Sequence, residues 1–206
     1  MFGNIFTTYL PISKFLASST TVSSQVIRYP GGSVGEDAVA KYSLRFADVY
    51  AEPEPGDASY NAYTQKGLTD VLAAAVATHS DFSMVIPTKR YMTDVATGVE
   101  DLTFFLRRLL HGDFGELPDH VMLELGNETS WIGWVNGVFT SGEGSCGYIA
   151  NAFLEVIKTV LASPVDNPRG LDIDVAVQIG TTTARGQSAI FNQITPENLR
   201  TVDAFV

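Results

Sequence analysis

The sequence has little cysteine, little positive charge and no long apolar run. Its single cysteine, Cys146, cannot form an internal disulfide. Lysine and arginine total 13 against 23 acidic residues, and a formal net charge of −10 disfavours binding to nucleic acid or to an anionic membrane surface. No apolar run approaches the ~18 residues of a membrane-spanning helix. The three histidines, His79, His111 and His120, lack the spacing of metal ligands, so no metal site is expected. No other cofactor is expected.

Hydrophobic residues make up 45% of the chain, which is enough to bury a core. Short β-branched runs alternate with longer amphipathic segments, and this alternation predicts an α/β fold with a parallel sheet. The expected strands are 1–6, 24–29, 83–87, 121–125 and 172–179.

Helices are expected at 64–78, 94–111 and 147–162, where apolar residues recur at helical spacing. Gly112 is a terminator for the second of these helices, and Pro164 stops the third. A last helix is expected to begin at Thr195, whose hydroxyl would cap it, shortly before the sequence ends at Val206.

Two motifs follow expected strands. Residues 124–128, Glu-Leu-Gly-Asn-Glu, resemble the Asn-Glu signature of retaining glycoside hydrolases with a (β/α)8 barrel, in the large clan that includes arabinofuranosidases, β-xylosidases and heparanase-like β-glucuronidases. Residues 28–32, Arg-Tyr-Pro-Gly-Gly, are similar to the R-[FY]-[PG]-G-G strand end of the same families. The resemblance implies an incomplete TIM barrel, of which this chain holds about the first five strand–helix units.

The resemblance makes Glu128 the general acid/base and Asn127 the residue that hydrogen-bonds the sugar 2-hydroxyl. Glycoside cleavage needs a carboxylic acid to protonate the leaving oxygen, and a hydroxyl-binding group whose bond strengthens in the transition state. The alternative is structural: Glu128 caps the next element and Asn127 belongs to a turn. In the resembled families the nucleophile is a glutamate on the seventh strand, and no position of this sequence matches it.

Two further residues, Arg28 and Trp131, have two possible roles each. Arg28 either orients a carboxylate at the floor of the active site or forms a buried ion pair that braces the barrel. Trp131 either stacks on a sugar ring or packs beneath its loop. Glu124 lies ~13 Å from Glu128 along an extended strand, too far for a retaining pair, and is expected to be satisfied within the barrel. Residues that could line the rim of the site, or simply be solvated, are Lys89, Arg90, Tyr91, Arg185 and Gln187.

Two other functions are compatible with the sequence. One is a non-catalytic carbohydrate-binding barrel that has kept the fold without the chemistry. The other is a nucleotide-binding α/β domain that uses Gly142 to Gly147, a G-x-G-x-x-G match at the start of a helix. Glu143 would then place a negative charge beside a pyrophosphate, which disfavours this second alternative.

The prediction is therefore a retaining glycosidase that acts on a poly- or oligosaccharide. Residues 1–206 would be the N-terminal portion of one catalytic domain, with the nucleophile beyond Val206, because such a barrel takes ~250 residues or more. This portion alone is expected to be inactive and prone to aggregate through open sheet edges. The N-terminal residues do not form a signal peptide, but the resembled families are mostly secreted, which favours an extracellular location.

Overall fold

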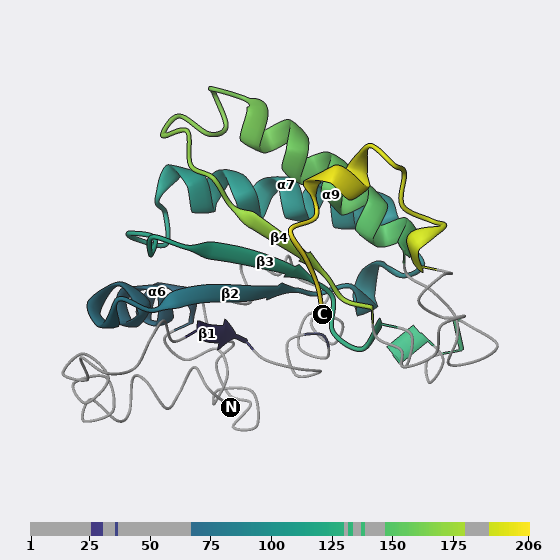
Figure 1. Cartoon of the computed structure of the whole chain (residues 1–206), viewed down its shortest axis with the longest axis horizontal. Helices are drawn as coiled ribbons and strands as arrows, with labels where there is room; N and C mark the ends of the chain where they lie inside the picture. The colour runs from purple at the N-terminus through teal and green to yellow at the C-terminus, as the bar shows by residue number, and fades with distance from the viewer. Residues whose placement is uncertain are drawn as a thin grey trace.

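The structure of the chain, a computed structural model, describes residues 26–30, 36, 67–129, 132–133, 137–138, 147–179 and 190–206. These residues form an α/β fold with a five-stranded, all-parallel sheet (Figure 1), so the expected fold class is confirmed. The strands are β1 (Val26–Tyr29), β2 (Asp81–Ile86), β3 (Val121–Leu125), β4 (Asp174–Val177) and β5 (Ala204–Phe205). The helices are α6 (Leu68–Thr78), α7 (Val95–His111), α9 (Gly147–Ala162) and the short 3-10 helices η1 (Lys89–Tyr91) and η2 (Asn198–Thr201).

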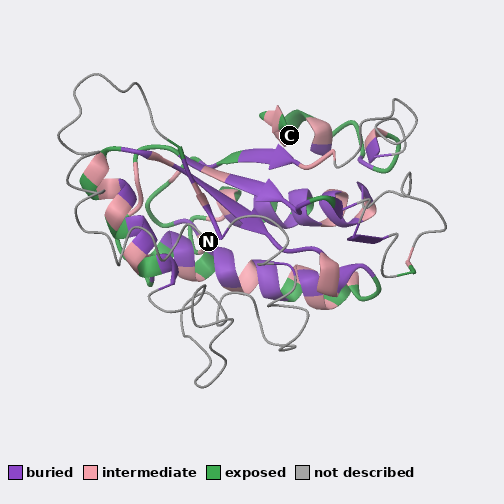
Figure 2. Cartoon of the chain, turned by 90° about the horizontal axis from the view of Figure 1, so that it is seen from below, coloured by how far each residue is buried: buried purple, intermediate pink, exposed green. Residues whose placement is uncertain are grey.

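The five strands lie side by side in chain order, and each pairs in parallel with the next. Crossovers between parallel strands are right-handed, so crossovers that always step in the same direction place their helices on the same face of the sheet. Buried side chains of α6, α7 and α9 accordingly form one hydrophobic cluster with alternate strand residues such as Phe82, Leu123 and Val175. Figure 2 shows this burial along the strands and on one stripe of each helix.

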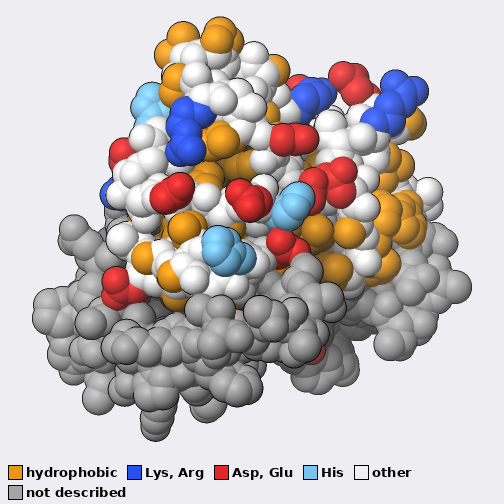
Figure 3. Space-filling model, turned by 60° about the vertical axis from the view of Figure 1, so that its left-hand side comes forward, with side chains coloured by type: hydrophobic (Ala, Val, Ile, Leu, Met, Phe, Trp, Pro, Cys, Tyr) orange, Lys and Arg blue, Asp and Glu red, His pale blue; other side chains and the backbone are white. Residues whose placement is uncertain are grey.

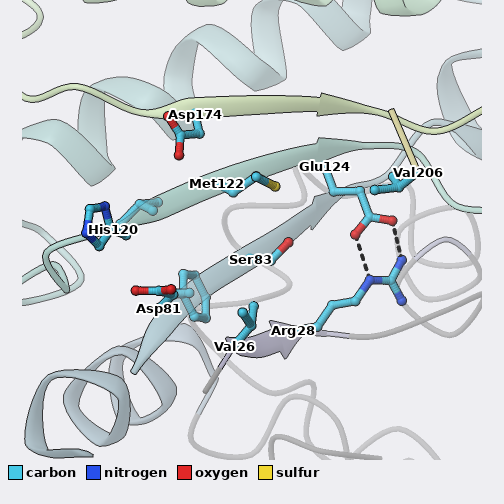
Figure 4. Close-up of a pocket in the computed structure, with 11 residues that line it drawn as sticks. Val26, Arg28, Asp81, Ser83, His120, Met122, Glu124, Asp174 and Val206 are labelled. Carbon is cyan, nitrogen blue, oxygen red and sulfur yellow. Dashed lines mark hydrogen bonds and ion pairs between the residues drawn. The ribbon is translucent and has the colours of Figure 1, made fainter. Parts of the chain in front are cut away.

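The opposite face of the sheet is more polar. Alternation along the strands and the strand register place Arg28, Ser83, Met122 and Asp174 in one row across this face. With Glu124 and neighbouring residues they line a cavity of about 520 Å³, called here the sheet cavity (Figure 4).

Two long helices have the expected bounds because their ends are marked by local signals. Asp94 caps α7 by accepting a hydrogen bond from the Thr97 amide at 3.2 Å, and Gly112 ends it with a φ of 85°. Helix α9 covers the predicted residues 147–162. Helix α6 begins at Leu68. The expected helix at 64–78 included Gly67, which has a non-helical conformation and lies outside α6, so the predicted start is wrong.

The end of the chain differs from the prediction. The Thr195 Oγ1 accepts from the Asn198 backbone amide at 3.2 Å, but the turn that it closes leads into the 3-10 helix η2, whose N-cap is Glu197, and not into an α-helix. The chain then enters β5, where the Val206 amide donates to the Val177 carbonyl at 3.1 Å. The described sheet thus contains the expected second to fifth strands and one more, while the expected strand at 1–6 lies outside the described residues.

In the part of the chain that the structure describes, no helix is both long enough and apolar enough to cross a membrane.

Candidate functional site at the carboxyl ends of the strands

An ion pair between Arg28 and Glu124 crosses the sheet at the carboxyl end of β1. The Arg28 Nε lies 2.6 Å from Glu124 Oε2 and its Nη2 lies 2.5 Å from Glu124 Oε1, so the guanidinium binds both carboxylate oxygens (Figure 4). The side chains are 38% and 7% exposed, respectively. This hydrogen bonding raises the pKa of Arg28 and keeps it cationic.

Strand register explains why these two residues meet. Arg28 is opposite Ser83 on β2, and Glu124 is opposite Val85 one row further along. Arg28 must therefore reach across the whole width of β2, about 10 Å from β1 to β3, and its long side chain and that of Glu124 together span this distance.

Asn127 is the second partner of Arg28. Its Oδ1 accepts a hydrogen bond from Arg28 Nη2 at 3.2 Å, and the residue is 6% exposed. Because a guanidinium can only donate, Arg28 fixes the orientation of the amide, with Oδ1 facing Arg28 and Nδ2 directed away from it.

Glu128 lies in a strained turn directly after β3. Its φ is 45°, in the left-handed region that non-glycine residues rarely adopt, and Gly126 two residues earlier has a φ of 84°. The turn is held at both ends: the Gly126 amide donates to the Ile86 carbonyl, and the Ile132 amide donates to the Glu128 carbonyl, each at 2.9 Å. The Glu128 residue itself is exposed. A non-glycine residue in this conformation costs ~1–3 kcal/mol, which the contacts at the two ends of the turn offset.

A buried carboxylate, Glu36, joins the loops of this site. It is 1% exposed and accepts hydrogen bonds from the amides of Thr88, Lys89 and Asn127 and from the Thr88 hydroxyl. Burial raises its pKa to about 7, although the four hydrogen bonds oppose this shift. Sequence reasoning missed Glu36. The signal was an acidic residue four positions after Gly32 among small residues of the sequence, but its neighbour Asp37 carries the same signal.

The loop after β2 is more buried than expected. Tyr91, predicted at a solvated rim, is fully buried, and its hydroxyl donates to Asp101 Oδ2 on α7 at 2.8 Å. Burial is the main cause that raises the pKa of Tyr91. Arg90 Nη1 lies 3.5 Å from the same Asp101 oxygen. The rim assignment is therefore wrong for Tyr91, because the aromatic ring fills space between the loop and α7, while Arg185 and Gln187 lie outside the described residues.

The structure thus brings two of the predicted site residues, Arg28 and Asn127, into direct contact, and Glu128 directly follows Asn127 in the chain. Arg28 forms an ion pair whose partner is Glu124. Trp131 lies outside the described residues. At the carboxyl ends of the strands, the cluster therefore offers the exposed Glu128, the oriented side-chain amide of Asn127 and the fixed cation of Arg28.

The start of α9, suggested as a nucleotide-binding turn, is occupied by protein groups. The Tyr148 amide donates to Gln193 Oε1 at 3.0 Å, and a Cβ added to Gly147 would lie 2.5 Å from the Ile190 carbonyl oxygen. Glycine at 147 is therefore required by packing against 190–193, and a phosphate would have to displace Gln193. Residues 142–146 of the motif lie outside the described part of the chain.

At the amino ends of β2 and β3, a polar cavity of about 330 Å³ brings His79 and His120 together despite their separation in the sequence. Figure 3 shows histidine and acidic side chains gathered on this face, and those that line the cavity are Asp81, Glu116 and Asp119. Within the described residues, no group of three or more histidine, cysteine or acidic side chains is arranged to hold a metal ion.

No protein-family model, curated protein or solved structure matches this chain.

Proposed function

We propose that this chain carries the acid/base part of the active site of a retaining glycoside hydrolase, with Glu128 as the general acid/base. The observation that carries the proposal is the turn after β3. The turn presents the exposed residue Glu128 with a strained backbone. Glu128 directly follows Asn127, whose side chain is oriented by Arg28 and whose backbone amide is held by Glu36.

The proposed scaffold is a (β/α)8 barrel. Its support is the consecutive strand order together with helices packed on one face of the sheet. A doubly wound sheet reverses its strand order and carries helices on both faces, whereas a barrel winds in one direction and keeps its helices outside. In this arrangement the sheet cavity belongs to the barrel interior, and the Arg28–Glu124 pair is a brace within it.

In the first step of the proposed reaction, the second carboxylate that retention requires bonds to the anomeric carbon as the glycosidic bond breaks, and the Glu128 carboxyl gives its proton to the leaving oxygen. In the second step, a water oxygen bonds to the anomeric carbon and displaces that carboxylate, while the Glu128 carboxylate takes the proton of the water. Asn127 Nδ2, directed away from Arg28, donates to a sugar hydroxyl. Retention needs a second carboxylate ~5 Å from the first, and we place it on a later strand, as the resemblance implies. The proposed substrate is a poly- or oligosaccharide outside the cell.

The test compares two glutamine variants of the complete protein on aryl glucuronides, xylosides and arabinosides. Glu128→Gln is expected to lower kcat/KM by ~10²–10⁴ on substrates with poor leaving groups, because these need the proton. The loss is expected to be much smaller with a dinitrophenyl leaving group, which departs without protonation. Glu100→Gln, at an exposed position of α7, is the matched control and is expected to retain full activity. Equal losses on both kinds of leaving group would contradict the acid/base role.

A further inference from the structure

The two carboxylate oxygens of Glu36 hold different loops. Oε2 accepts from the amides of Thr88 and Lys89, both at 2.6 Å, and so serves the loop after β2. Oε1 accepts from the Asn127 amide at 3.1 Å and lies 3.2 Å from Thr88 Oγ1. Glu36 therefore connects the segment after β1 to the loops after β2 and β3.

A proton can be accommodated on only one of these oxygens. On Oε2 it would face two N–H donors at 2.6 Å, neither of which can accept it. On Oε1 it could be donated to Thr88 Oγ1, since a hydroxyl can accept as well as donate. An Oε1 that carries a proton is a poor acceptor for the Asn127 amide, whereas Oε2 can still accept from Thr88 and Lys89.

We propose that Glu36 is a positioning residue for Asn127 and Glu128. Ionised Oε1 holds the backbone amide of Asn127, and protonation of Oε1 by solvent releases that backbone amide while the loop after β2 stays bound. Releasing the amide loosens the turn that fixes Glu128. The effect on catalysis rests on the proposed glycosidase function, whereas the release of the amide does not.

The surroundings of Glu36 allow this proton exchange near neutral pH. Burial raises the pKa of Glu36 to about 7, and the charge of Glu36 in turn contributes to the raised pKa of Tyr91. The charged and titratable groups on the neighbouring strands and loops are Arg28 and Tyr29 on β1, Glu124 on β3, Glu128 after β3, and Lys89, Arg90 and Tyr91 after β2, of which Arg90 and Tyr91 contact Asp101 on α7. Arg28 is engaged by Glu124, and Arg90 lies within ion-pair distance of Asp101.

The test follows backbone amides of the whole chain by ¹⁵N-resolved NMR from about pH 5.5 to 8.5. As the pH falls through the pKa of Glu36, the Asn127 amide proton is expected to move upfield, as a lost hydrogen bond requires. The Lys89 amide, bound to the other oxygen, is expected to move less. An Asn127 amide with no inflection in this range, or equal shifts at Asn127 and Lys89, would overturn the proposal.

Two variants assign the inflection. Glu36→Gln is expected to abolish it, while Glu128→Gln is expected to keep it, which excludes titration of the adjacent carboxylate as its source. If Glu36→Gln does not fold, the comparison of the wild-type chain with Glu128→Gln still decides, because loss of the inflection in Glu128→Gln would overturn the assignment to Glu36.

Activity separates this proposal from the glycosidase proposal. A protein without glycosidase activity whose Asn127 amide titrates with Glu36 would refute the proposed function and support the positioning role. An active protein whose Asn127 amide does not titrate would refute only the positioning role. When both hold, the pH profile of kcat for wild type is expected to contain an acid limb near neutral pH that follows the Asn127 inflection.

Discussion

Replacing Arg28 by methionine tests whether the ion pair across β2 stabilises the fold. Glu124 is 7% exposed at its side chain, and both of its carboxylate oxygens bind Arg28. Breaking a fully buried pair costs ~3–5 kcal/mol, because the remaining charge is left without compensation. Arg28 is 38% exposed, so water can enter where the guanidinium was, and we expect a loss of ~2 kcal/mol in the free energy of unfolding.

The assay is urea unfolding at pH 7, followed by circular dichroism. The double variant Arg28→Met/Glu124→Met is expected to lose less than the sum of the two single variants, because it leaves no uncompensated charge in the sheet cavity. The difference gives a coupling free energy of ~1–2 kcal/mol.

Arg107→Met is the matched control. Its Nε lies 2.8 Å from Asp166 Oδ1, a similar distance, but its side chain is 55% exposed. An exposed pair contributes little, so the loss is expected to be clearly smaller than that of Arg28→Met. An Arg28→Met variant that is no less stable than Arg107→Met, or single effects that simply add, would refute the argument from burial.

Three further predictions concern other parts of the structure. Burial raises the pKa of Glu36 from its ordinary value of 4.5 to about 7, so the stability of wild type relative to Glu36→Gln is expected to fall by ~3 kcal/mol as the pH rises between these values. Unfolding series at several pH values check this. Gly98→Ala is expected to destabilise the fold by ~1–2 kcal/mol in thermal or urea unfolding, since the added Cβ would lie 2.8 Å from Tyr91 Cγ; a stability gain would mean that helix propensity outweighs this clash. Asn198→Ala is expected to lower the free energy of unfolding by ~1–2 kcal/mol, because the Asn198 Nδ2 donates to the carbonyl oxygen and to the Oδ1 of Asn151 and so holds η2 against α9. An unchanged unfolding midpoint would contradict this.

Much of the fold could be predicted because its signals are local. The apolar stripe of α7, its Asp94 cap and its Gly112 terminator all lie within one segment, and the periodicity of α9 gave both of its ends. Strand β5 could not be predicted in this way. Two residues carry no periodicity, and Ala204–Phe205 form a strand only because β4 offers an unpaired edge beside them.

The candidate site also combines residues that a local sequence pattern predicts with contacts that it does not predict. The sequence by itself determined that an asparagine and a glutamate follow a buried strand, and that an arginine ends another strand, because motif and strand lie within a few residues of each other. Only the tertiary structure decided that Arg28 binds Glu124, since the partner depends on the register of three strands. Only the tertiary structure decided that Glu36 is buried, because its partners lie 52, 53 and 91 residues further along the chain. A carboxylate becomes a buried acceptor only when distant loops bring their amides to it, and a local sequence pattern does not contain that information.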